Sequence, residues 1–268
     1  MAFLPLPQPF DFALTTERFR AFGVDRANVW EDGALYHVVA GREVRIASAA
    51  GGVDVEPLDA ATEPAVRRLL GLPFDLDGFY AWAAGDGVLA PVARRLAGFR
   101  PPLSLDPFEA LVGAIVAQQV SLFSARAIRN RLVERFGERH GVAWAFPARG
   151  RLAAAREDEL LALGFSRAKA AYVVGLARAE LDLDGLAALP DDEVKARLTA
   201  LRGIGEWTAD WFLARHLARP HAWPWGDLAL RKAVASFYGD VDVRDAGARF
   251  HPFQNLTAHY LLTASRVP

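Results

Sequence analysis

The sequence contains no cysteine, and only three of its 31 basic residues are lysines. Without cysteine, disulfides, thiolate zinc sites and cysteine-held iron–sulfur clusters are excluded. The six histidines show no spacing typical of metal ligands, and P-loop and serine-nucleophile motifs are also missing. These absences remove several classes of metalloenzyme, nucleotide-binding protein and hydrolase from consideration.

Long apolar runs and a strong net charge are missing too. No segment approaches the apolar length that crosses a bilayer, and the N-terminal segment lacks a basic region and is interrupted by Pro5, Pro7 and Pro9. We therefore expect a cytoplasmic protein with no membrane partner, and a monomer. The formal net charge of −1 gives no general attraction to polyanions, so a nucleic-acid site must be a local patch.

The 268 residues, 52% of them hydrophobic, are enough for a sizeable core and for two or three domains or lobes. Residues 1–98 are predicted to form an N-terminal α+β domain with a small antiparallel sheet. Its expected elements are a hairpin over 28–40 around Asp32-Gly33, strands over 42–47 and 51–57, and helices over 12–22 and 63–71. Residues 99–268 are predicted to be a mainly helical domain.

The helical domain has recognisable helix starts. Asp106 and Glu109 form a capping-box pattern around Pro107, and Ser121 begins the next helix. Apolar spacing predicts further helices over 156–163, 166–180, 190–201, 206–218, 227–238 and 252–265.

The stretch LRGIGEWTADW, residues 201–211, predicts two helices joined by a tight hairpin at Gly203-Ile204-Gly205. Glycine permits positive φ and leaves no Cβ, so another backbone can approach the turn closely. The amides of the turn and of the following helix N-terminus suit a phosphate. A plain αα-hairpin with glycine caps explains the same two glycines.

Beyond the hairpin, HAWPWGDLALRKA brings Asp227 to the start of a predicted helix near a cluster of four tryptophans, residues 207, 211, 223 and 225. The simplest role for Asp227 is that of an N-cap, which stabilises a helix by roughly 1 kcal/mol. A catalytic role is compatible with capping, because amide hydrogen bonds and the helix dipole favour the ionised carboxylate.

Three segments together resemble a known superfamily: LRGIGEWTADW, PWGDLALRK, and VGAIVAQQVS at residues 112–121. They resemble the helix-hairpin-helix (HhH-GPD) DNA glycosylases, and within them the 3-methyladenine DNA glycosylase II (AlkA-like) type, over about residues 100–265. The resemblance implies two helical lobes that form a cleft near 205–227. Arg202 and Trp225-Gly226 depart from the family pattern, which often has proline in the hairpin and nearer the aspartate.

The implied function is that of a monofunctional DNA glycosylase, an N-glycosyl hydrolase that flips alkylated bases such as 3-methyladenine out of double-stranded DNA and excises them in base excision repair. The implied catalytic residue is Asp227, since a fixed carboxylate stabilises positive charge on the sugar and orients a water. Trp207, Trp211 and Phe253 are expected to stack on the base, although Phe253 could equally be an ordinary core residue.

The resemblance also implies DNA contacts from Gln118, Gln119, Ser121, Gly203, Gly205, Glu206 and Thr208, with Gln119 filling the gap left by the flipped base. Two exposed loop glutamines would explain Gln118 and Gln119 as well. No cofactor is expected to be required; a monovalent cation, sodium or potassium, is expected on the carbonyls of Thr199, Leu201 and Ile204.

Two features bear on the alternatives. Five arginines, at 126, 129, 131, 135 and 139, are either phosphate contacts or a solvated helix face.

Related glycosylases with lyase activity carry lysine two residues after the second hairpin glycine, where this sequence has Trp207. The alternative functions are a non-catalytic helix-hairpin-helix DNA-binding protein, in which Asp227 only caps its helix, and a core-only αα-hairpin in an unrelated protein.

Overall fold

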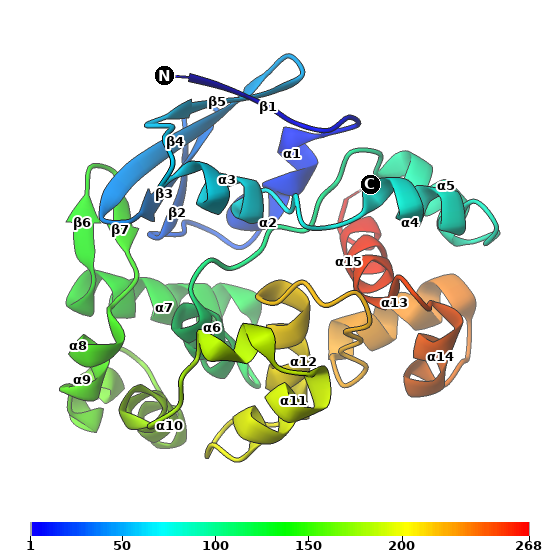
Figure 1. Ribbon diagram of the computed structural model, residues 1–268. Coiled ribbons are helices and arrows are strands. Elements are labelled where there is room, and N and C mark those ends of the chain that lie inside the picture. Colours follow the sequence, from blue (N-terminus) through cyan, green and yellow to red (C-terminus); the bar gives the residue numbers. More distant parts are fainter. Residues whose placement is uncertain (1, 268) are drawn as a thin grey trace.

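The computed structural model describes residues 2–267 and begins with a five-stranded antiparallel sheet in the order β1-β5-β4-β3-β2 (Figure 1). The strands are β1 (Ala2–Pro5), β2 (Asn28–Glu31), β3 (Ala34–Val39), β4 (Arg42–Ala49) and β5 (Gly52–Glu56). Alternate residues such as Val44 and Ile46 point into a core shared with α1 (Phe12–Thr15), α2 (Glu17–Arg20) and α3 (Glu63–Leu69). The predicted N-terminal α+β segment with an antiparallel sheet is confirmed.

Two details of this segment differ from the sequence prediction. The helix expected over 12–22 is divided at Thr16, whose hydroxyl donates to the Phe12 carbonyl over 2.6 Å. Strand β1 was not predicted, because its pairing with β5 is a long-range contact that the proline-rich N-terminal sequence does not indicate.

The rest of the described chain is mainly helical, as predicted. Its helices are α4 (Leu76–Ala83), α5 (Leu89–Arg95), α6 (Pro107–Ala117), α7 (Leu122–Phe136), α8 (Arg149–Ala153), α9 (Glu157–Ala162), α10 (Arg167–Arg178), α11 (Asp191–Thr199), α12 (Glu206–Arg215), α13 (Leu228–Tyr238), α14 (Val243–Arg249) and α15 (Gln254–Ala264), with a 3-10 turn at Gly185–Ala188. The predicted series lacked α4, α5, α8 and α14, which are eight residues long or shorter.

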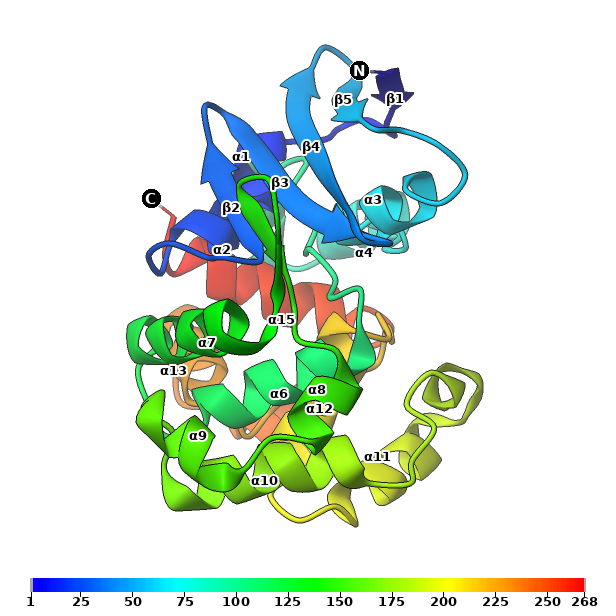
Figure 2. The same ribbon diagram turned by 90° about the vertical axis from the view of Figure 1, so that its left-hand side faces the viewer.

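Helix α15 is the centre of the helical part, since every one of its residues is buried. Figure 2 shows it crossing the molecule beneath the N-terminal sheet. Helices α4 and α5 pack into this helical core, with the hydroxyls of Tyr80 and Tyr260 2.9 Å apart. The sequence places a domain boundary at residue 98, but the two hydrophobic cores divide nearer residue 72.

A two-stranded ribbon, β6 (Glu138–His140) and β7 (Ala143–Ala145), joins the two parts of the molecule. It reaches from the end of α7 to the N-terminal sheet (Figure 2), where the Glu43 carboxylate accepts from the amides of Val142 and Ala143 over 2.6 and 2.7 Å. The ribbon thereby fixes the sheet domain against α7. Among residues 2–267, no helix has the length and apolarity needed to span a membrane.

Candidate active site

The predicted hairpin lies between α11 and α12, and its two glycines have different functions. Gly203 has a φ of +90°, and a Cβ there would fall 2.1 Å from the Tyr172 ring, so close packing and backbone conformation both require glycine. Gly205 has an ordinary φ, and a Cβ there would meet nothing within 4 Å. The first glycine therefore permits packing, and the second leaves the surface of the turn open.

The first turn of α12 has no side-chain cap, since Gly205 occupies the N-cap position. Glu206 is exposed there, whereas Thr208 is 1% exposed, and its amide donates to the Gly205 carbonyl. The side chain of Thr208 thus belongs to the core. Its buried position does not support the DNA contact that the resemblance implies for it. Ile204 is buried between the glycines and anchors the turn.

The α6–α7 turn packs directly against the hairpin. Gln118 donates from Nε2 to the Gly203 carbonyl over 2.9 Å, so this glutamine connects the two elements and is not a free surface group. Gln119 has a φ of +54° and is exposed. Ser121 caps α7 by accepting from the Ser124 amide over 3.1 Å. Only Gln119 of the two glutamines is therefore available to reach outward.

Asp227 is the N-cap of α13 and is half-buried. Its Oδ1 atom accepts from the Leu230 amide over 3.0 Å. Its Oδ2 atom accepts from two indoles, Nε1 of Trp207 over 2.9 Å and Nε1 of Trp211 over 3.0 Å. Because a carboxylate has about four acceptor positions, these three donors leave one position on Oδ1 open.

Trp211 is 4% exposed, and its environment differs from the one predicted. The Arg215 guanidinium carbon lies 3.5 Å from the centre of its ring, and the His259 ring meets it edge-on at 5.7 Å. With its surfaces covered in this way, Trp211 is not available for the base stacking expected of it. It orients Asp227 instead, and the half-buried Trp207 is the indole that remains partly accessible.

The hairpin, the aspartate and the glutamine turn thus meet in one site, and residues 112–255 match the profile of the HhH-GPD superfamily of base excision DNA repair proteins. The chain belongs to this superfamily. It is 32% identical to the DNA-3-methyladenine glycosylase of Bacillus subtilis over 68% of its own length, and 35% identical to the DNA-3-methyladenine glycosylase 2 of Escherichia coli over 48%.

The match spans 64% of the Bacillus relative. It spans 42% of a Mycobacterium tuberculosis relative that is named a probable bifunctional transcriptional activator and DNA repair enzyme. The chain thus covers less than two thirds of the length of these curated relatives. Among solved structures, the 3-methyladenine DNA-glycosylase of Archaeoglobus fulgidus is similar over 99% of this chain and 98% of its own, with a TM-score of 0.88 and 28% identity. A Clostridium acetobutylicum 8-oxoguanine glycosylase/lyase shares the fold, with a TM-score of 0.81 at 20% identity.

Phe253 is part of an aromatic cluster in this HhH-GPD chain. Its partly buried ring packs against Phe79 at 5.8 Å and Trp82 at 5.6 Å, both on α4. This packing agrees with the alternative that Phe253 is an ordinary core residue. The same contacts hold α4 against the start of α15.

The five arginines over 126–139 divide into two groups, because Arg126 and Arg129 are largely buried in ion pairs whereas Arg131, Arg135 and Arg139 are exposed, as the solvated-face alternative expects. Arg126 and Arg129 both pair with the buried Asp25, and Arg129 also pairs with Glu109. The other three arginines also donate hydrogen bonds within the protein. Arg131 donates to the Leu163 carbonyl, Arg135 to the Glu159 carboxylate and Arg139 to the Gly141 carbonyl. Arg126 and Arg129 therefore hold the N-terminal domain against α7.

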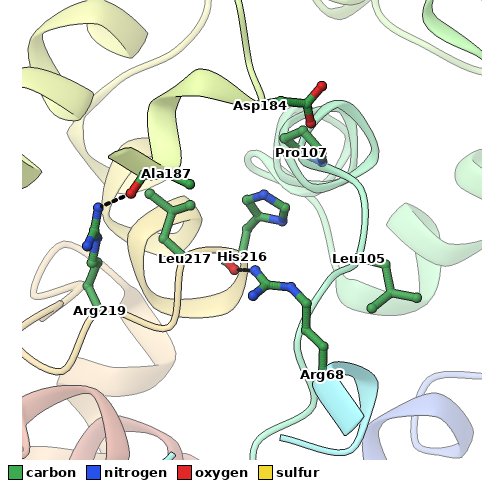
Figure 3. A pocket seen from close by; sticks show the side chains of 8 residues that line it. All are labelled: Arg68, Leu105, Pro107, Asp184, Ala187, His216, Leu217 and Arg219. Carbon is green, nitrogen blue, oxygen red and sulfur yellow. Dashed lines mark hydrogen bonds between the residues drawn. The ribbon is translucent and has the colours of Figure 1, made fainter. Parts of the chain in front are cut away.

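A cavity of about 260 Å³ lies at the other end of α12, between α3, the 3-10 turn and the start of α6. Figure 3 shows Arg68 donating to the His216 carbonyl and Arg219 to the Ala187 carbonyl. The His216 ring meets the Ser104 carbonyl at 3.0 Å, and burial, followed by the charge of Arg68, lowers its pKa to about 4. The two arginines that line the cavity, Arg68 and Arg219, already donate to carbonyl groups of the protein. We therefore interpret this cavity as a junction between the N-terminal domain and the helical part, and not as a ligand site.

The sequence prediction missed two features beside the site. Val120, Leu122 and Phe123 are exposed large apolar residues next to Gln119. Arg215 lies four residues after Trp211 on α12, and the regular spacing of Trp207, Trp211 and Arg215 could have indicated a shared helix face.

Proposed function

We propose that this HhH-GPD protein is a monofunctional DNA glycosylase that flips a damaged base out of double-stranded DNA and hydrolyses its N-glycosidic bond in base excision repair. The observation that supports this best is the Asp227 carboxylate, oriented by two indole N–H groups and one backbone amide beside the hairpin. A residue that only caps a helix needs the amide hydrogen bond and has no use for two tryptophan donors. This difference favours the enzyme over a non-catalytic DNA-binding protein.

The open acceptor position of Asp227 is where the chemistry would occur. Cleavage of the bond between base and sugar develops positive charge on the sugar, and a fixed carboxylate stabilises that charge and orients a water. The base must first leave the stack, at a cost of a few kcal/mol that is smallest for damaged or mispaired bases.

Duplex DNA is the proposed partner, and the hairpin suits its backbone. The uncapped start of α12 at Gly205 offers backbone amides to a phosphate, and the space beside Gly205 admits a second backbone. A sodium or potassium ion on the carbonyls of Thr199, Leu201 and Ile204 would bridge the turn to that phosphate.

Gln119 is proposed to fill the vacancy in the duplex, because it is exposed at the tip of the α6–α7 turn. The apolar side chains of Val120, Leu122 and Phe123 beside it would contact the opened base stack. Related structures titled as complexes with DNA, those of Clostridium acetobutylicum and Schizosaccharomyces pombe, support DNA as the partner. The monomeric state and the cytoplasmic location stay predictions.

Alkylated bases are the proposed substrates, since the relatives from Bacillus subtilis, Escherichia coli and Archaeoglobus fulgidus are named 3-methyladenine DNA glycosylases. The test is a release assay on duplexes carrying 3-methyladenine, 7-methylguanine, 1,N6-ethenoadenine or hypoxanthine. Asp227→Asn keeps a capping side chain but loses the charge, so release should fall by about two orders of magnitude or more while DNA binding persists.

The matched control is Asp242→Asn, the same substitution at the N-cap of α14. It should leave release unchanged. Normal release by Asp227→Asn would exclude the catalytic role, and binding of damaged DNA without release by the wild-type protein would favour the non-catalytic alternative.

A further inference from the structure

Large apolar side chains gather on the surface at the start of α7. Among residues 2–267, eight such side chains are exposed, and four of them belong to this one group: Val24, Val120, Leu122 and Phe123. The other four lie apart from one another along the chain: Phe3, Leu161, Leu228 and Val241. A single exposed apolar side chain is ordinary, whereas a cluster of them on one surface is typical of a contact site.

Val24 reaches this group because the loop between α2 and β2 runs along one face of α7. The half-buried Phe22 ring meets the Phe123 ring edge-on at 5.9 Å. Further along α7, Asn130 donates to the Val24 carbonyl over 2.8 Å and accepts from the Arg26 amide over 3.0 Å. Phe123 and Asn130 are about two helical turns apart, so they share a face. The N-terminal domain and α7 together form an apolar patch: Phe22, Val24, Val120, Leu122 and Phe123.

The polar groups of the loop hold it on α7. The loop follows α2, which lies above α7 in Figure 2. The Asp25 carboxylate pairs with Arg126 and Arg129, and Arg129 also pairs with Glu109. This network contains two groups of each charge sign, so its charges balance. The loop is therefore fixed by its polar groups, while the Val24 side chain remains 63% exposed.

The apolar patch continues the surface on which DNA is proposed to bind. Gln119, the residue proposed to fill the vacancy in the duplex, directly precedes Val120 in the α6–α7 turn. The other glutamine of this turn, Gln118, donates to the Gly203 carbonyl of the hairpin over 2.9 Å. Hairpin, turn and patch are thus connected by sequence and by direct contacts.

We propose that Phe22 and Val24 extend the DNA-contacting surface onto the N-terminal domain, where they contact the base and sugar groups that become exposed beside a flipped nucleotide. This inference rests on the proposed function, because it takes double-stranded DNA with a flipped base as the partner. The proposed function includes contacts from Val120, Leu122 and Phe123, which all belong to the helical part. The contact from the other domain is new, and through it both domains hold the opened duplex.

The chemistry of the patch favours bases and sugars over phosphates. Removal of one nucleotide from the stack exposes the apolar faces of its neighbours, and apolar or aromatic side chains shield such faces from water. Phe123 offers an aromatic ring for this contact, and Phe22 supports it edge-on. A phosphate needs a cation with free donors, whereas Arg266, 5.8 Å from the centre of the Phe22 ring, pairs with Glu17. The patch should therefore distinguish an opened duplex from an intact one.

The test uses the absence of cysteine, because Val24→Cys gives the protein a single reactive thiol. The rate of its alkylation by a maleimide is measured for the protein alone and with a saturating duplex that carries an abasic-site analogue. DNA should lower this rate by about fivefold or more, because thiol reactivity depends on exposure. Val241→Cys, the same substitution at an exposed valine between α13 and α14, is the matched control, and its rate should not change.

A second measurement tests the contribution of the contact to affinity. Val24→Ser should weaken binding of the duplex with the abasic-site analogue by about threefold to tenfold, and binding of the intact duplex much less. The slope of affinity against salt concentration should stay the same, because no phosphate contact is lost. Val241→Ser is the control and should bind both duplexes normally. Both valines are exposed, so thermal unfolding should show that the two variants fold.

Three results would overturn the inference. The first is an unchanged alkylation rate of Val24→Cys in saturating DNA. The second is an equal loss of affinity for opened and intact duplexes, or a smaller salt slope, since either indicates a general or ionic contact. The third is a protein that sediments as a dimer, which Val24→Ser dissociates without loss of DNA affinity, because the patch would then bind a second copy.

The inference and the proposed function fail separately. Base release by the wild-type protein, together with an unprotected thiol in Val24→Cys, would overturn the inference and leave the glycosylase function intact. Protection of that thiol, in a protein that releases no base, would support the DNA contact and overturn the function.

Discussion

The indole Nε1 of Trp207 lies 2.9 Å from Oδ2 of Asp227, which also accepts from Trp211 one helical turn later. The two donors come from the first turns of α12, and the acceptor is the first residue before α13. The carboxylate therefore cannot rotate without breaking two hydrogen bonds. Its orientation is set by the helix that follows the hairpin, so the proposed DNA contact of the hairpin and the proposed chemistry at Asp227 both depend on α12.

Trp207→Phe and Trp211→Phe should each lower the maximal rate of base release by about tenfold, because each removes one N–H donor to Asp227 and retains most of the ring. DNA affinity should change little, since the substitutions leave the hairpin and the Gln119 turn intact. Single-turnover kinetics together with a binding titration measures both effects. Trp144→Phe on β7 is the control, and a normal rate in both active-site variants would show that the indole donors do not orient the carboxylate.

The protein should release the base without cutting the strand. Trp207 occupies the position where related lyases have lysine, Lys195 is paired with the buried Asp210 at 2.5 Å, and Lys169 donates to the Val116 carbonyl over 2.8 Å. Lys232 is exposed on α13 and lies five residues, about 500° of helix rotation, after Asp227.

Borohydride should therefore trap no covalent protein–DNA adduct, and product strands should break only after alkali. A trapped adduct that disappears in Lys232→Gln would contradict the hydrolytic mechanism.

The two hairpin glycines should respond differently to substitution. Gly203→Ala places a Cβ against the Tyr172 ring at positive φ, so the free energy of unfolding should fall by roughly 1–3 kcal/mol. Gly205→Val meets open space in an extended conformation, so the variant should fold normally and bind all DNA more weakly, whatever the lesion. Thermal unfolding and a binding titration on damaged and undamaged duplexes separate the two results. Unchanged DNA affinity in a folded Gly205→Val would remove the hairpin from the interface.

His216 should make the fold sensitive to acid. Its folded pKa of about 4 lies below the ordinary value of 6.5, so between these values the unfolded state binds a proton that the folded state does not. Stability is therefore complete above about pH 6.5 and falls as the pH drops toward 4, by roughly 3 kcal/mol for this group.

His216→Asn keeps a donor for the Ser104 carbonyl and removes the titrating ring. The difference in unfolding free energy between pH 7.5 and pH 4.5 should be smaller in this variant than in the wild-type protein. His37 and His259, whose pKa values are also lowered by burial, should retain part of the acid sensitivity in this variant. An identical pH dependence in both proteins would show that His216 is not protonated on unfolding in this range.

Local sequence determined the elements that define the family site. Helix periodicity, the Asp106 and Ser121 caps and the Gly203–Gly205 turn each act within a few residues, so they specify α6, α7, α11 and α12 without reference to the rest of the chain. The same holds for Asp227 at the start of α13, because an N-cap is recognised from its own first turn.

Tertiary structure decided which groups these elements bring together. The pairing of Asp25 with Arg126 and Arg129 spans about a hundred residues, and it converts a basic helix face into a domain contact. Arg215 covers the face of Trp211, and Gln118 donates to the Gly203 carbonyl of the hairpin. Both contacts depend on how α6, α12 and α15 pack against one another. Burial and charge are properties of the assembled core, so the roles of Trp211, Gln118 and the arginines could be assigned only after the chain had folded.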